Sequence, residues 1–74
     1  MSKKQILKLI LETAGFTLEK YELIRNNGLV GYEFEAHRNN VFEFQVATDS
    51  FDDAVRETLE GIYQTEDVVF SAVS

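Results

Sequence analysis

Apolar and polar residues alternate with a period of two over much of the chain, and this alternation predicts an antiparallel sheet. The pattern places strands at about residues 17–25, 29–37 and 41–48, with asparagine-containing turns between them. One face of such a sheet is apolar and packs on the core, while the other is polar. The predicted apolar face consists of Tyr21, Leu23, Val30, Tyr32, Phe34, Ala36, Phe42, Phe44 and Val46.

The first turn sets the register of the first two strands. Asn27-Gly28 is typical of a two-residue type I′ turn, because both residues tolerate a positive φ. It pairs Leu23 with Tyr32 and sends apolar residues of both strands to the same face. A turn at Asn26-Asn27 keeps the same parity.

The second turn is decided by a comparison of registers. A two-residue turn at 39–40 sets Phe34 opposite Gln45, which breaks the alternation. A three-residue loop at 38–40 restores the alternation but sets two acids directly opposite each other. We therefore predict a loop at 39–41.

This register determines the polar face of the sheet. It pairs His37 with Glu43 and Glu35 with Gln45. The polar face is mainly acidic and carries Lys20, Glu22, Glu33, Glu35, His37, Glu43 and Gln45.

Apolar residues at helical spacing predict a helix on each side of the sheet sequence. The first is expected at about residues 2–14, with Ser2 as its N-cap. The second is expected at about residues 50–64, where Ser50 and Asp53 form a pair like a capping box. Its apolar stripe is predicted to lie in the core and consists of Phe51, Ala54, Val55, Leu59, Ile62 and Tyr63.

Residues 66–73 fit either a short helix or a fourth strand. Thr65 followed by two acids is typical of a helix start, whereas the valines that follow favour a strand. The predicted fold is therefore a single α+β domain over residues 1–74, in the order α-β-β-β-α and with this segment at its end. If the segment does not dock internally, it forms a self-association patch that would support a homodimer, through Val68, Val69, Phe70 and Val73.

Composition narrows the class of protein further. A domain of 74 residues buries only about 60% of the surface of its unfolded chain, so a binding surface is expected rather than a deep pocket. No cysteine occurs, which excludes disulfides and thiolate metal sites and fits a cytoplasmic protein. Lys8 and Glu12 interrupt the N-terminal apolar run, so we expect neither a signal peptide nor contact with a membrane.

Charge is distributed unevenly along the chain. The formal net charge is −6, with about +2 in residues 1–25 and about −8 in residues 26–74. An acidic body of this kind repels nucleic acid and attracts basic partners.

The sequence gives little support for a catalytic site or a metal site. His37 is the only histidine, so a site with two histidine ligands is excluded. Neither Ser50 nor Ser71 lies in the sequence context of a nucleophile elbow. The paired carboxylates are predicted to face solvent, without the desolvation that acid–base catalysis requires. We therefore expect no enzyme activity, no cofactor and no metal.

The element order is similar to that of double-stranded-RNA-binding domains. That family presents a lysine cluster at the start of its second helix, which grips phosphates across a groove. The corresponding positions here read Asp49, Ser50, Phe51, Asp52 and Asp53. This reversal of charge argues against direct binding of nucleic acid.

Size, acidity and element order also resemble those of small inhibitors encoded by phages and mobile elements, including several anti-CRISPR and anti-restriction proteins. The sequence therefore predicts a non-enzymatic inhibitor or regulator that engages a basic, nucleic-acid-handling protein. Two alternatives are a homo-oligomeric assembly or adaptor protein that pairs through the C-terminal segment or a sheet edge, and a domain whose acidity serves only solubility. The candidate contact residues are Glu33, Glu35, Glu43, Asp52, Asp53, Glu57 and Glu60.

Overall fold

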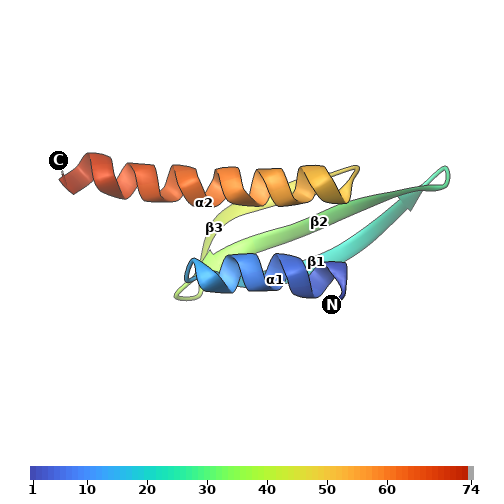
Figure 1. The fold of residues 1–74 in the computed structure, drawn as a ribbon, viewed down its shortest axis with the longest axis horizontal. Helices are drawn as coiled ribbons and strands as arrows, with labels where there is room; N and C mark the ends of the chain where they lie inside the picture. The colour runs from blue at the N-terminus through green and yellow to red at the C-terminus, as the bar shows by residue number, and fades with distance from the viewer. Residues whose placement is uncertain (74) are drawn as a thin grey trace.

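The chain forms a layer of two helices on one face of a three-stranded antiparallel sheet (Figure 1). The computed structural model describes the backbone of residues 1–73 and the side chains of residues 1–65. The strands are adjacent in chain order, so the predicted order α-β-β-β-α and the antiparallel meander are confirmed. The elements are α1 (Lys3–Thr13), β1 (Thr17–Asn26), β2 (Leu29–Arg38), β3 (Val41–Thr48) and α2 (Phe51–Val73).

The core is built on one face of the central strand. Tyr32, Phe34 and Ala36 alternate along β2, and none of them is more than 6% exposed. Because they occupy every second position, they all point toward the helices. The rest of the buried cluster is supplied by Leu7, Leu11, Phe16, Val46, Ala54 and Ile62.

The two helices are offset from the sheet along the long axis of the molecule. Figure 1 shows α1 and α2 running side by side in the same direction, with the β1–β2 hairpin projecting past them at one end and α2 extending past α1 at the other. Residues 22–26 of β1 are accordingly exposed. Leu23, which the alternation predicted on the buried face, is therefore 50% exposed.

Local capping defines both ends of α1. The hydroxyl of Ser2 accepts from the backbone N–H of Gln5, and the Gln5 side chain accepts in return from the backbone N–H of Ser2. At the other end Gly15 takes a φ of 89°, and the N–H of Phe16 donates to the carbonyl of Leu11. Since Phe16 is buried, this turn places the first core residue directly after the helix.

The turn between β1 and β2 is the predicted one. Asn27 and Gly28 take φ values of 53° and 80°, as a two-residue turn of this kind requires. Leu23 lies opposite Tyr32, so the register predicted from the sequence is confirmed.

β1 also contains a β-bulge that the alternation did not predict. Lys20 and Tyr21 together lie opposite Phe34, and Lys20 takes a positive φ of 53°. The extra residue shifts the alternation, so that both Leu18 and Tyr21 pack against the core. The rings of Tyr21 and Phe34 stack with centroids 6.2 Å apart.

The loop predicted at 39–41 is wrong. Asn39 and Asn40 instead form a two-residue turn, with φ values of 55° and 64°. Regular pairing from this turn would set Phe34 opposite Gln45. A β-bulge in β3 removes that conflict, and a pattern of residue types does not show where a bulge lies.

The bulge in β3 lies at Glu43, which has no ladder partner of its own. His37 pairs with Phe42 and Ala36 pairs with Phe44, so the predicted pair of His37 with Glu43 is wrong. Phe42 was predicted on the buried face, which is also wrong. It is 52% exposed and lies on the far side of the sheet, where its ring meets that of His37 at a centroid distance of 5.8 Å.

α2 begins as predicted and continues further. The hydroxyl of Ser50 accepts from the N–H of Asp53, and the helix then runs without a break through the segment expected to be a separate helix or strand. Thr65 donates its hydroxyl to the carbonyl of Gly61 and so bonds within the helix rather than capping a new one. The candidate self-association side chains lie outside the described range, namely Val68, Val69, Phe70 and Val73.

Small residues of α2 face the sheet. Ala54 and Thr58 are fully buried, and the Thr58 hydroxyl donates to the Ala54 carbonyl at 2.7 Å. Gly61 lies so close to Phe44 that an added Cβ would approach the ring to 2.5 Å. The close packing of helix on sheet therefore depends on small side chains at these positions.

The predicted core positions of Leu59 and Tyr63 are wrong, because these side chains are 51% and 72% exposed. Thr58 occupies the position that faces the sheet, and each further residue turns about 100° around the helix. Leu59 therefore points to the side of α2, and Tyr63 points outward.

We expect Gly61→Ala to lower the free energy of unfolding by about 1–2 kcal/mol, because the clash with Phe44 costs more than the helix propensity of alanine restores. Urea denaturation of the variant and the parent measures this. Gly61→Ala combined with Phe44→Leu should recover part of the loss, since the ring is removed. An increase of about 1 kcal/mol for Gly61→Ala alone would show that the helix is not packed tightly there.

Candidate functional site

The carboxylates predicted to contact a partner fall on separate surfaces. Glu33 and Glu35 alternate with buried residues of β2, so they point away from the helices. We call this side of the sheet the open face. Glu43 is exposed at the bulge of β3. The structure places the other candidates on α2, and these are Asp52, Asp53, Glu57 and Glu60.

The open face contains a shallow hollow of about 400 Å³ over the bulge of β1. The lining residues are Lys20, Tyr21, Glu22, Glu33, Phe34, Glu35 and Gln45.

Two pairs of acids lie directly opposite each other across β1 and β2. Glu22 pairs with Glu33, and Glu19 pairs with Glu35. Directly opposed side chains in a sheet have Cβ atoms about 4.5–5.5 Å apart, and like charges at that distance destabilise the sheet. The open face therefore concentrates negative charge at a cost to stability.

Of these four glutamates, only Glu35 has a hydrogen-bond or ion-pair partner among the described side chains. His37 donates from Nε2 to Oε1 of Glu35 at 2.8 Å, and Lys20 Nζ lies 3.9 Å from Glu35 Oε2. The side chains of His37 and Glu35 are only 21% and 20% exposed, whereas that of Lys20 is 76% exposed. Among the described side chains, neither Glu22 nor Glu33 has an ion-pair partner.

The sequence did not identify Glu19 and Glu22 as contact residues. Regular alternation back from Tyr21 places Glu19 on the buried face, and the bulge at Lys20 returns it to the open face. The glutamates of β1 thereby extend the cluster that β2 begins. Glu22 was predicted on the polar face, where the structure places it.

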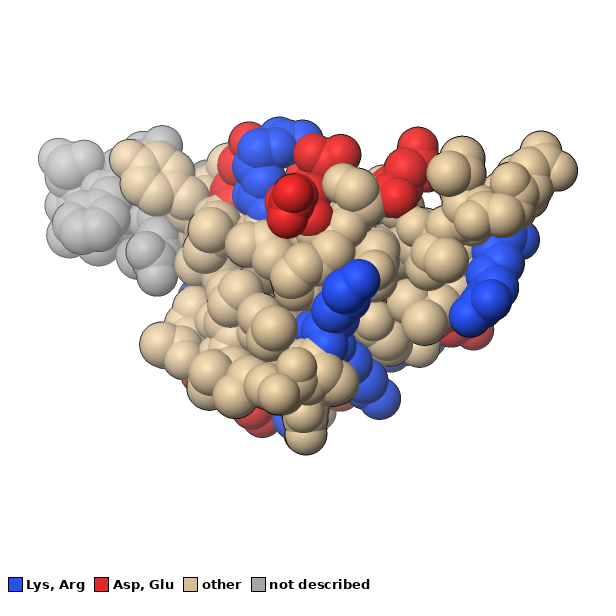
Figure 2. Space-filling model, turned by 45° about the vertical axis from the view of Figure 1, so that its right-hand side comes forward, with Lys and Arg blue, Asp and Glu red and all other residues tan. Residues whose placement is uncertain are grey.

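The acids of α2 form a more balanced surface. Arg56 bridges Asp53 and Glu60 at 3.4 Å and 3.0 Å, and its hydrogen bond to Glu60 contributes most to raising the pKa of Arg56 above its usual value. Figure 2 shows a basic group among acidic ones at the top of the molecule, the side on which α2 lies in Figure 1. The open face is therefore the stronger candidate for a contact that depends on charge.

Burial raises the pKa of Tyr21 above its usual value, and the nearby Tyr32 adds to the shift. The ring of Tyr21 packs on the helix side of the sheet, where it stacks on Phe34 and lies under Lys4 of α1. Its phenol therefore adds no charge to the open face.

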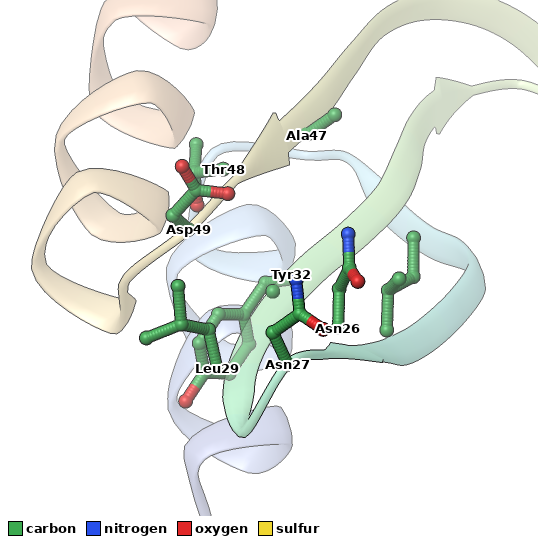
Figure 3. Close-up of a pocket in the computed structure, with 9 residues that line it drawn as sticks. Asn26, Asn27, Leu29, Tyr32, Ala47, Thr48 and Asp49 are labelled. Atoms are coloured by element: carbon green, nitrogen blue, oxygen red, sulfur yellow. The ribbon is translucent and has the colours of Figure 1, made fainter.

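A second hollow of about 400 Å³ lies where the hairpin leaves the body (Figure 3). Thr48 and Asp49 line one side, and Asn26 and Asn27 line the hairpin side. Thr48 uses its hydroxyl to donate to the carbonyl of Ser50. Asp49 is the one carboxylate in this lining, so the hollow brings no pair of acids together.

The residues considered as catalytic candidates have separate structural roles. Ser50 caps α2, and His37 lies on the open face against Glu35. Within the described part of the chain, no group of three or more His, Asp or Glu side chains is arranged to hold a metal ion. Neither described helix is long and apolar enough to cross a membrane.

No protein-family model matches this chain, and no curated protein or solved structure is significantly similar to it. The resemblance to double-stranded-RNA-binding domains thus rests on element order alone. Asp52 and Asp53 lie in the first turn of α2, where that family carries lysines, and acids at this position stabilise the helix dipole.

We expect Glu33→Gln to raise the free energy of unfolding by about 0.5 kcal/mol, because it removes one member of a like-charge pair. The gain should shrink in 0.5 M salt, which screens the repulsion. Chemical denaturation at two salt concentrations measures both effects.

Asp52→Asn is the matched control, since it removes the same charge from the first turn of α2. It should lower stability by about 0.5 kcal/mol through the loss of a favourable dipole interaction. If Glu33→Gln also lowered stability, the carboxylates of the open face would not repel each other as proposed.

Proposed function

We propose that this protein is a non-enzymatic binding module that engages a basic protein surface through the open face of its sheet. The observation that carries the proposal is the two pairs of directly opposed glutamates, Glu22 with Glu33 and Glu19 with Glu35. Three of these four residues, Glu22, Glu33 and Glu35, line one hollow. Cations supplied by a partner would relieve a repulsion that the isolated chain retains.

The strand that carries two of the carboxylates is fixed before binding, and one of them is also oriented by a hydrogen bond. Glu33 and Glu35 stand on the central strand, which is bonded to a neighbour on each side, and His37 orients Glu35 by a hydrogen bond. A preorganised surface loses little side-chain entropy when a partner binds. Same-face neighbours on a strand are separated by about 6.8 Å, so successive carboxylates can each accept from a different basic side chain.

An arrangement of this kind suits a partner whose own site is built for phosphates. Such a site presents Arg and Lys side chains along a groove, and arginine pairs with carboxylates in the same bidentate geometry that it uses for phosphates. We therefore propose that the partner is a nucleic-acid-handling protein and that this chain inhibits or regulates it. Proteins of the phage or mobile-element accessory type fit the same size and charge.

A role in solubility alone accounts less well for this surface. Solubilising charges work best when both signs are interspersed, as Arg56 is among the acids of α2. On the open face the acids face one another, and Glu35 is mostly covered. Opposed like charges lower stability, which a role in solubility alone does not require.

Affinity capture from the native host tests the proposal. Wild-type chain and the variant Glu33→Lys/Glu35→Lys serve as baits, and captured proteins are identified by mass spectrometry. We expect basic, nucleic-acid-handling proteins on the wild-type bait, elution by 0.5 M salt, and at least a tenfold loss on the variant.

The variant Asp53→Lys/Glu60→Lys is the matched control, because it reverses the same number of charges on α2. It should retain the captured proteins. Circular dichroism verifies that each bait is folded. Equal capture by all three baits, or capture that resists salt, would exclude the open face as the contact surface.

A further inference from the structure

The two hollows of the sheet adjoin each other on the open face. The hollow over the bulge, which we call the acidic half, is lined on the three strands by Glu22, Glu33 and Gln45. The hollow at the root of the hairpin, which we call the apolar half, is lined two residues nearer the hairpin on each strand by Ile24, Gly31 and Ala47. Residues two apart on a strand share a face and lie about 6.8 Å from each other. The two halves therefore form one continuous surface across the sheet.

The open side of the hairpin carries no charge. Arg25 is the only charged residue in 23–32, and it pairs with Val30, which packs toward the helices. Ile24 and Leu29 point to the open side instead, and they are 44% and 68% exposed. Exposed apolar side chains beside a charged region are typical of a surface that another protein contacts.

Gly31 contributes to the apolar half by having no side chain. A Cβ added there would lie 3.0 Å from the carbonyl oxygen of Thr48, so the close approach of the two strands favours glycine. Ala47 is the nearest residue of β3 in the lining and is also small. Together they leave a hollow of about 400 Å³ beside the exposed side chain of Ile24.

We propose that the apolar half binds one apolar side chain of the same basic partner that the acidic half attracts. The inference rests on the proposed function, because the carboxylates supply the attraction and the hollow supplies the selectivity. Carboxylates alone attract any basic surface. An adjoining apolar hollow favours those partners that carry an apolar residue next to their basic ones.

The register defines the spacing that the partner has to match. Glu35, Glu33 and Gly31 occupy successive positions on the open side of β2, about 6.8 Å apart. An extended segment with two basic residues and then an apolar residue at alternate positions has the same spacing. The occupant is therefore an extended basic segment in which a residue such as leucine follows the basic ones.

Two capped synthetic peptides test this, namely Arg-Ser-Arg-Ser-Leu-Ser and the counterpart with serine in place of leucine. Both carry the same charge, so they differ only in the apolar side chain. Nuclear magnetic resonance titration of the full chain in low salt measures both affinities. We expect the leucine peptide to bind about fivefold more tightly, because its side chain loses contact with water, and to shift the amide of Gly31 more than the serine peptide does.

Ile24→Gln should abolish this preference, so that both peptides bind with the affinity of the serine peptide. Leu23→Gln is the matched control, because it changes the adjacent residue, which is similarly exposed at 50% but pairs with Tyr32 on the helix side. It should keep the preference. Both side chains are half exposed, and circular dichroism verifies that each variant is folded.

Glu33→Lys/Glu35→Lys separates this inference from the proposed function, since it should weaken both peptides at least tenfold. If the two peptides bound the wild-type chain equally and were both lost on this variant, the apolar contact would be overturned and the proposed function would stand. Loss of the preference in Leu23→Gln as well as in Ile24→Gln would place the contact on the other side of the hairpin and overturn the inference. Absence of binding by either peptide to the wild type would overturn both proposals.

Discussion

The burial of one side of β2 is the constraint on which the rest of the structure depends. The helices cover Tyr32, Phe34 and Ala36. Because side chains alternate along a strand, the residues between them point to the opposite side of the sheet. Glu33 and Glu35 become a charged surface because their neighbours are core. The hydrophobic core and the candidate site thus lie on the two faces of the same strand. A register shift of one residue would place the glutamates in the core and the apolar residues in solvent.

Two β-bulges, one in β1 and one in β3, match the alternation of these strands to that of β2. The bulge at Lys20 and Tyr21 keeps Leu18 in the core and adds Glu19 to the open face. The bulge at Glu43 allows a tight Asn-Asn turn without moving Phe44 out of the core. Each bulge disrupts the hydrogen-bond ladder locally. Beyond the bulge, apolar residues still face the helices and acidic residues still face the open side.

The position of α2 on the sheet depends on the size of its side chains as much as on their hydrophobicity. α2 approaches the sheet through the small residues Ala54, Thr58 and Gly61, and at Gly61 even an added Cβ would collide with Phe44. With these small residues facing the sheet, Leu59 and Tyr63 lie on the exposed sides of α2. The apolar groove between α1 and α2, which Leu9 and Leu59 help to line, is therefore a consequence of the close packing beneath it.

The sequence by itself determined the order of elements, the Asn27-Gly28 turn and the Ser2 and Ser50 caps, because each depends on local propensity or on the period of a pattern. Only the tertiary structure decided the positions of the bulges, the rotation of α2 and the continuation of α2 beyond Thr65. These depend on contacts between residues distant in the chain, where the volume of one side chain limits another. For the same reason the sequence predicted Glu33 and Glu35 as candidate contact residues, while their pairing with Glu22 and Glu19 emerged only from the fold.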